Sequence, residues 1–127
     1  MFNKGTILNS IDNSGVLQVK CIKIYSKRNW GYLGDLVLVI VRKSFFNKRL
    51  KKSKFVEPGT LVKAIVVQLK YKYRRRDGFC VSFDNNGIVN LNKQMIPSGS
   101  RLLGPVAMEL HYSQLGKKFL SLAPLVI

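Results

Sequence analysis

Turn-forming residues divide most of this chain into short segments rich in β-branched and aromatic residues. The turns combine glycine with proline, aspartate, asparagine or serine, and they fall at residues 12–15, 31–35, 58–59, 77–78 and 84–87. The segments between them have the composition of β-strands and cover residues 16–25, 36–41, 61–69, 79–83 and 88–91. Short strands at this spacing predict an all-β fold, and a small closed barrel in particular, because closure leaves no sheet edge exposed.

Three of the predicted strands carry further information. In segment 16–25 the alternation of apolar positions breaks after Cys21, which predicts a β-bulge or burial on both faces. Segment 36–41 is apolar throughout and predicts a strand covered on both sides. Segment 61–69, LVKAIVVQL, is predicted as the central strand.

The C-terminal part of the chain has a different pattern. Met108, Tyr112 and Leu115 recur at helical spacing, which predicts a short helix. Gly116 then has the position of a glycine that ends a helix. We expect helical structure over about residues 106–118, and we expect all 127 residues to form a single domain.

Positive charge is the second strong feature of the sequence. Lys and Arg number 22 against 6 Asp and Glu, which gives a net charge of +16. Half of these basic residues lie in two runs, 43–54 and 70–76, on either side of segment 61–69. A folded domain with this imbalance repels itself unless a polyanion binds it, so the composition indicates a nucleic-acid partner. The residues predicted to bind RNA are Lys43, Lys48, Arg49, Lys51, Lys52, Lys54, Lys70, Lys72, Arg74, Arg75 and Arg76.

Strand geometry and the neighbouring aromatic residues indicate where the two basic runs lie and how they could contact RNA. Consecutive arginines at 74–76 cannot all hide their charges in a strand, so we expect them to project from a loop or a hairpin tip. Aromatic side chains are interleaved with both runs: Phe45, Phe46, Phe55, Tyr71 and Tyr73. Such rings stack on unpaired bases in some RNA-binding proteins, but they equally anchor hairpins to a barrel, and the sequence leaves both interpretations open.

The residues that catalysis or metal binding would need are scattered. Four aspartates lie in or beside predicted turns and are explained by turn chemistry: Asp12, Asp35, Asp77 and Asp84. The single histidine, His111, has no nucleophile beside it. Cys21 and Cys80 lack the clustered partners that zinc needs, and both are predicted to be buried, reduced thiols. We therefore expect no enzyme activity, no cofactor and no metal site.

The N-terminal residues, MFNKGTILNS, lack the apolar block of a secretory signal and the pattern of a transit peptide. The longest apolar stretch is far shorter than the roughly 20 residues that cross a bilayer. We expect the protein to act in the compartment where it is made.

Three stretches of the sequence together form a specific pattern. The first is NSIDNSG at 9–15 followed by VKCIKI at 19–24. The second combines KAIVV at 63–67 with DG at 77–78 and FDNN at 83–86. The third combines GSRLLGPV at 99–106 with EL at 109–110 and LSLAP at 120–124. In their order and spacing, which extend over nearly the whole chain, these stretches resemble the universal large-subunit ribosomal protein L-fourteen family in its bacterial and organellar form.

The resemblance implies a five-stranded β-barrel with a basic hairpin extension and short C-terminal helices. It also implies a structural role in the large ribosomal subunit, with ribosomal RNA as the ligand and an intersubunit bridge to small-subunit RNA. Ribosomal protein L-nineteen is the implied neighbour, and the ribosome silencing factor would dock on Ser100, Arg101 and Lys118.

The sequence departs from the family pattern at two places. The basic insert 43–57 is longer than in bacterial relatives, and Asn90 replaces an aliphatic residue, which we expect to weaken its strand locally. The bacterial type and the abundance of Asn, Lys, Ile and Phe suit an AT-rich organellar genome. We therefore expect a mitochondrial location, with a plastid or the bacterial cytoplasm as alternatives.

Two other functions fit parts of the sequence. One is a free single-strand RNA-binding chaperone built on an oligonucleotide-binding barrel, which would need aromatic side chains on one exposed strand face. The other is a small nuclease, which would need carboxylates converging on one metal-binding site.

Overall fold

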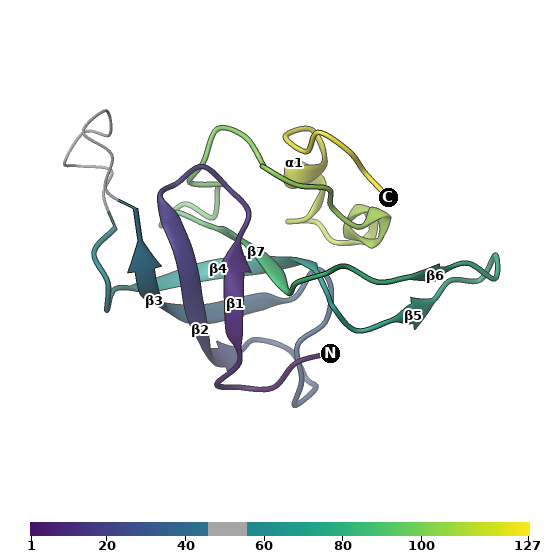
Figure 1. Ribbon diagram of the computed structural model, residues 1–127, viewed down its shortest axis with the longest axis horizontal. Coiled ribbons are helices and arrows are strands. Elements are labelled where there is room, and N and C mark those ends of the chain that lie inside the picture. Colours follow the sequence, from purple (N-terminus) through teal and green to yellow (C-terminus); the bar gives the residue numbers. More distant parts are fainter. Residues whose placement is uncertain (46–55) are drawn as a thin grey trace.

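The computed structural model describes residues 1–45 and 56–127 as a closed five-stranded barrel with two additions (Figure 1). The barrel strands are β1 (Ile7–Ser10), β2 (Val16–Ile24), β3 (Leu36–Ser44), β4 (Leu61–Gln68) and β7 (Gly87–Asn90). They follow the order β1-β2-β3-β4-β7, and parallel pairing of β1 with β7 closes a sheet that is otherwise antiparallel. The prediction of an all-β closed barrel is confirmed.

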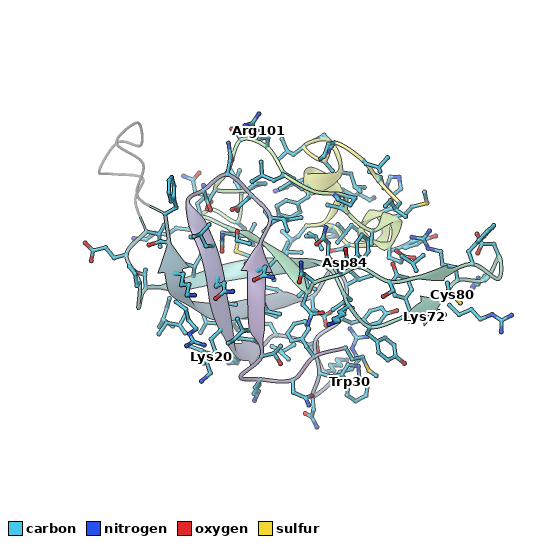
Figure 2. The ribbon with its side chains drawn as sticks, in the orientation of Figure 1. Lys20, Trp30, Lys72, Cys80, Asp84 and Arg101 are labelled. Carbon is cyan, nitrogen blue, oxygen red and sulfur yellow. The ribbon has the colours of Figure 1, made fainter. Side chains whose placement is uncertain are left out.

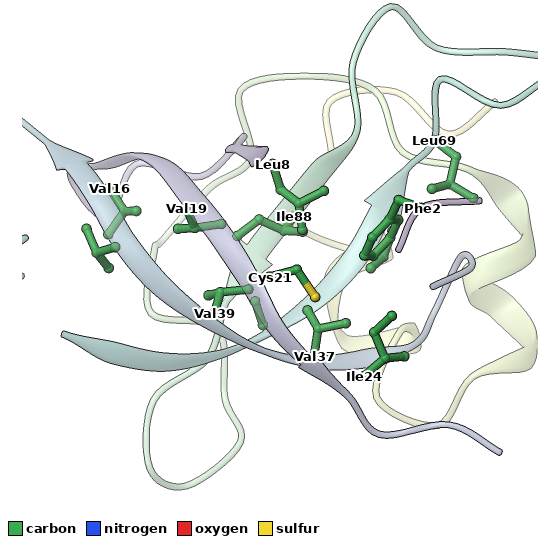
Figure 3. Close-up of a cluster of buried hydrophobic side chains, with 13 residues drawn as sticks. Phe2, Leu8, Val16, Val19, Cys21, Ile24, Val37, Val39, Leu69 and Ile88 are labelled. Atoms are coloured by element: carbon green, nitrogen blue, oxygen red, sulfur yellow. The ribbon is translucent and has the colours of Figure 1, made fainter. Parts of the chain in front are cut away.

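Strand β2 contains the irregularity that its sequence predicts. Cys21 is opposite Val39, whereas Lys23 is opposite Leu38, so the register shifts between these two rungs. An extra residue reverses the alternation of side chains along a strand. Cys21 and Ile24 therefore both point into the barrel, where Cys21 is buried as predicted (Figure 3).

The two apolar strands β3 and β4 are buried differently. In β3, burial alternates, because Val37, Val39 and Val41 face the core while the intervening residues are only half-buried. The prediction that this strand is covered on both sides is therefore wrong. In β4, residues 64–68 are buried on both faces, as expected for a central strand. The C-terminal segment covers the outer face of β4, where Ile65 and Val67 pack with Leu110 and Phe119 in a second core.

A two-stranded hairpin projects from the barrel (Figure 1). It consists of β5 (Tyr73–Arg74) and β6 (Cys80–Val81), joined by the predicted turn at residues 77–78. Gly78 has a φ of +90°, a conformation that other L-residues rarely adopt, and the Phe79 amide donates to Asp77 Oδ1 at 3.0 Å. Cys80 is exposed on this hairpin, so the prediction that it is buried is wrong.

The C-terminal helices are shorter than predicted. They are the 3₁₀ helix η2 (Met108–Tyr112) and α1 (Lys117–Leu120), with Gly116 at the beginning of α1 instead of at the end of a helix. Gly116 has ordinary helical φ, and a Cβ there would lie 2.6 Å from the Leu110 carbonyl oxygen. Close packing, and not helix termination, therefore requires this glycine. Within residues 1–45 and 56–127, no helix has the length and apolarity needed to span a membrane.

Candidate nucleic-acid interface

The predicted RNA-binding residues fall in two regions, of which the structure describes one and the edge of the other. Lys70, Lys72, Arg74 and Arg76 are exposed at the base, along the strands and at the turn of the hairpin. Lys43 is exposed near the end of β3. The remaining residues of the first run lie outside the described residues: Lys48, Arg49, Lys51, Lys52 and Lys54, with Phe46 and Phe55.

The hairpin has two chemically distinct faces. Tyr73 is paired with Val81, and both are buried, whereas Arg74 is paired with Cys80, and both are exposed. Because side chains alternate along a strand, these two pairs point to opposite faces of the ribbon. Lys72 is exposed two residues before Arg74, so the alternation places it on the same face as Arg74. We call Lys72, Arg74 and Cys80 the outer face of the hairpin.

The inner face of the hairpin is fixed to the C-terminal segment by a polar cluster. Arg75 Nε donates to Glu109 Oε1 at 2.6 Å, and Arg75 Nη2 donates to Oε2 at 3.1 Å. The same Nη2 donates to the Ile127 carbonyl at 2.6 Å, and the Tyr73 hydroxyl donates to Glu109 Oε2 at 2.9 Å. We call Tyr73, Arg75, Glu109 and Ile127 the clamp. The expectation that all three arginines at 74–76 project freely is therefore wrong for Arg75.

The pKa shifts in the clamp agree on one protonation pattern. Burial alone raises the pKa of Glu109, but hydrogen bonds from Arg75 and Tyr73 outweigh it and leave that pKa below its ordinary value. Burial, followed by the hydrogen bond to Glu109, raises the pKa of Tyr73. The hydrogen bond to Glu109 raises the pKa of Arg75. At neutral pH the clamp therefore holds an ionised Glu109, a charged Arg75 and a neutral Tyr73.

A groove of about 540 Å³ lies between the hairpin and η2. Residues 73–77 of the hairpin line it together with Tyr32, Met108, Glu109 and Tyr112. Tyr112 is 91% exposed and Met108 is 50% exposed. The sequence contains no signal for this exposure, because it depends on how the 3₁₀ helix is placed against the hairpin.

The aromatic residues near the basic runs serve different purposes. Tyr73 is buried, hydrogen-bonded in the clamp and packed edge-on to Tyr32 with ring centroids 6.1 Å apart, so it anchors the hairpin. Tyr71 and Phe45 are 47% and 56% exposed and do not share this role.

The candidate catalytic residues do not converge. Asp35 accepts the Tyr32 amide at 2.8 Å and pairs with Arg28, while Asp77 accepts the Phe79 amide, so both stabilise turns as predicted. His111 is exposed. In the part of the chain that the structure describes, no three His, Cys, Asp or Glu side chains are grouped as metal ligands would be.

The family model described as ribosomal protein L14p/L23e matches residues 1–127, which is the whole chain. The chain belongs to this family. It is accordingly a structural protein of the large ribosomal subunit and not an enzyme. The match replaces the nuclease and free-chaperone interpretations.

In this L14p/L23e-family protein the residues that the resemblance assigns to a protein partner are all exposed: Ser100, Arg101 and Lys118. Asn13 holds the loop that contains Ser100 and Arg101 in place. Its Oδ1 accepts a hydrogen bond from the Ser100 amide at 2.9 Å, and its Nδ2 donates to Ser100 Oγ at 2.8 Å. The loop is joined to the segment after α1 by a 3.3 Å hydrogen bond from the Leu102 amide to the Leu122 carbonyl. Arg101 projects at this edge, away from the hairpin (Figure 2).

Asn90, which departs from the family pattern, has hydrogen-bonding partners inside the protein. Its amide N–H donates to Asp12 Oδ2 at 3.0 Å, and its side-chain Nδ2 donates to Ser10 Oγ at 2.9 Å and Ser14 Oγ at 3.3 Å. Asp12 Oδ1 also accepts the hydroxyl groups of Ser10 and Ser14 at 2.7 and 2.6 Å. We call Ser10, Asp12, Ser14 and Asn90 the buried knot. Asn90 thus ties β7 to the β1–β2 turn, and the expectation that it weakens its strand stays a prediction.

Proposed function

We propose that this protein binds large-subunit ribosomal RNA through the outer face of the hairpin. The observation that carries the proposal is the division of the hairpin into two faces. Lys72 and Arg74 are exposed on one face, whereas Tyr73 and Arg75 on the other are engaged within the protein. The hairpin thus presents cations from a ribbon whose orientation is already set.

The physical reason is the combination of charge and preorganisation. Each phosphate that a Lys or Arg neutralises releases condensed counterions, which makes binding strong and dependent on salt. Side chains on a fixed ribbon lose less entropy on binding than side chains on a loose loop. Phosphate contacts of this kind set the position and orientation of a protein on RNA without reading its sequence.

The first experiment removes the charges of the outer face. The double variant Lys72→Ala and Arg74→Ala is compared with Lys20→Ala and Lys23→Ala, which removes the same charge from exposed positions on β2. The hairpin variant should enter large subunits poorly and should lower the salt slope of RNA binding by about 0.7 to 0.9 for each phosphate contact. If both variants lost subunit incorporation and salt slope equally, the proposal would be contradicted. RNA binding would then depend on the total positive charge and not on the hairpin.

The second experiment uses the thiol on the outer face. Cys80 is exposed and Cys21 is buried, and the chain contains 2 cysteines, so a maleimide reagent should modify the folded protein at Cys80 alone. In assembled large subunits Cys80 should be protected from the reagent. Full reactivity of Cys80 in the subunit would show that the outer face does not meet RNA.

We further propose that the protein contributes to an intersubunit bridge with small-subunit RNA and lies beside a protein of the L-nineteen family. Ser100, Arg101 and Lys118 are proposed as the docking surface of the ribosome silencing factor, and their exposure supports this proposal. Lys118→Glu should weaken capture of purified silencing factor by large subunits. The matched variant Lys117→Glu, one residue earlier on the same helix, should not.

We also propose that the protein acts in mitochondrial ribosomes, with plastid or bacterial ribosomes as the alternatives. The composition and the bacterial type of the sequence support this proposal. An antibody against the chain should detect it in large subunits from purified mitochondria. Its recovery only from plastid or bacterial ribosomes would contradict the proposal.

A further inference from the structure

We infer that the groove between the hairpin and η2 binds one unpaired RNA nucleotide, with its base against Tyr112 and a flanking phosphate at Arg76. This inference rests on the proposed function, because it assumes that the hairpin lies against RNA. It concerns the groove beside η2, whereas the phosphate contacts proposed above use the outer face, and Arg74 belongs to both because it also lines the groove.

The size and lining of the groove fit a nucleobase. Its volume of about 540 Å³ lies within the range of about 300–1,000 Å³ in which proteins bind small ligands. Tyr32, Tyr73, Met108 and Tyr112 supply apolar surface. Tyr112 is 91% exposed, so its ring faces can stack on a base without breaking any core packing.

The charges of the groove favour RNA over a protein segment as the occupant. Arg75 and Glu109 neutralise each other in the clamp. The other charged residues that line the groove are Arg74, Arg76 and Asp77, and Asp77 Oδ1 accepts the Phe79 amide in the turn. The balance is positive, and Arg76 belongs to the exposed hairpin turn, where a phosphate can reach it.

The clamp also explains why the groove is available before RNA binds. The hydrogen bonds of Glu109 to Arg75 and Tyr73 fix one wall of the groove relative to the other. A base held in a duplex is stacked and paired, so it cannot enter a groove of this kind, whereas an unpaired base can be turned out of its helix. The ligand class is therefore a bulged or loop nucleotide.

The test measures binding of the full chain to two fluorescein-labelled RNA duplexes, identical except that one carries a single bulged uridine. The wild-type protein should bind the bulged duplex about tenfold more tightly, as expected for one stacked base. Tyr112→Ala should remove this preference without changing the salt slope, and Tyr112→Phe should keep it. Tyr25→Ala, at an exposed tyrosine of the barrel, should also keep it. Thermal melting should show that all three variants are folded.

The outcomes separate this inference from the proposed function. Equal affinity for the two duplexes, with steep salt dependence, would contradict nucleotide binding in the groove. It would leave the proposal that the outer face binds RNA standing. A preference for the bulge that survives Tyr112→Ala would also overturn the inference, because the bulged base would then be bound without Tyr112. Failure to bind either duplex at physiological salt would overturn both proposals.

Discussion

The buried knot and the clamp are two polar clusters that do the same task in different environments. Both join segments far apart in the chain, since 78 residues separate Asp12 from Asn90 and 34 separate Arg75 from Glu109. Asp12 and Asn90 are only 4% and 2% exposed, whereas the side chains of Arg75 and Glu109 are 20% and 25% exposed. A polar group orphaned inside a protein cannot turn to water, but one at the surface can. The knot should therefore control stability, and the clamp should control where the hairpin points.

The two clusters also differ in whether all of their buried polar atoms have hydrogen-bond partners. In the knot, Asn90 Oδ1 is buried with no hydrogen-bond donor among the described residues. In the clamp, both Glu109 oxygens accept hydrogen bonds, and the arginine is held at two of its nitrogens. The knot thus retains one unfavourable group beside its hydrogen bonds.

The largest expected effect comes from removing the acceptor at the centre of the knot. Asp12→Ala removes the acceptor of the Ser10 and Ser14 hydroxyl groups and of the Asn90 backbone amide. We expect the free energy of unfolding to fall by about 3 kcal/mol, since each orphaned buried group costs about 1–3 kcal/mol. Urea unfolding measures the change. Asp84→Ala, at an exposed turn residue, is the control and should stay within about 0.5 kcal/mol of wild type.

The next effect should come from Asn90→Leu, which restores the aliphatic character of the family at this position. The substitution removes the unpartnered oxygen, but it also removes the donor to Ser10 and Ser14. The hydrogen bond from the backbone amide of residue 90 to Asp12 remains. We therefore expect the free energy of unfolding, measured in urea, to fall by about 1 kcal/mol. A gain in stability would show that the unpartnered oxygen, and not the hydrogen bonds, dominates the knot.

A charge exchange tests whether the clamp positions the hairpin. Arg75→Glu places two carboxylates together and should release the hairpin, lowering RNA affinity several-fold while the barrel loses about 1 kcal/mol or less. Adding Glu109→Arg restores an opposite-charge pair with the wild-type net charge, and it should recover most of the affinity. If Arg75 instead contacts phosphate directly, the second substitution will not restore binding.

The smallest effect should appear in the pH dependence of the clamp. The pKa of Glu109 is lowered in the folded protein from an ordinary value of 4.5, so the clamp stabilises the fold above that pH and loses this contribution as the pH falls through the folded pKa. Urea unfolding of wild type and Glu109→Gln should differ by about 0.5–1 kcal/mol at pH 7. The difference should shrink toward zero in strong acid. A difference that grows on acidification would contradict the protonation pattern of the clamp.

Local signals account for what could be predicted. The turn at 77–78 predicts its hairpin because glycine after aspartate satisfies a backbone conformation that few other residues adopt. The bulge in β2 is visible because it breaks a two-residue alternation within one short segment. Both features depend on residues only a few positions apart, so they could be predicted from the sequence alone.

The errors arose where a residue's environment is made by a distant part of the chain. Cys80 lies between the apolar residues Phe79 and Val81 but is exposed, whereas Tyr73 lies between Lys72 and Arg74 but is buried, because Tyr73 contacts Glu109 of η2. Gly116 resembles a helix end, yet its role is set by contact with Leu110. The hydrogen-bonding partners of Asn90 likewise come from the distant turn that contains Asp12.

The amino-acid sequence by itself determined the barrel strands β2, β3, β4 and β7, the turns beside them and the excess of positive charge, because these follow from short-range backbone preferences and from composition. Strand β1 (Ile7–Ser10) was not predicted. Only the tertiary structure decided which cations remain available. Arg74 and Arg75 are adjacent and chemically identical, but the fold brings Glu109 to one of them. A carboxylate within hydrogen-bonding distance commits the Arg75 guanidinium to the protein, whereas Arg74 is exposed and has no ion pair among the described residues.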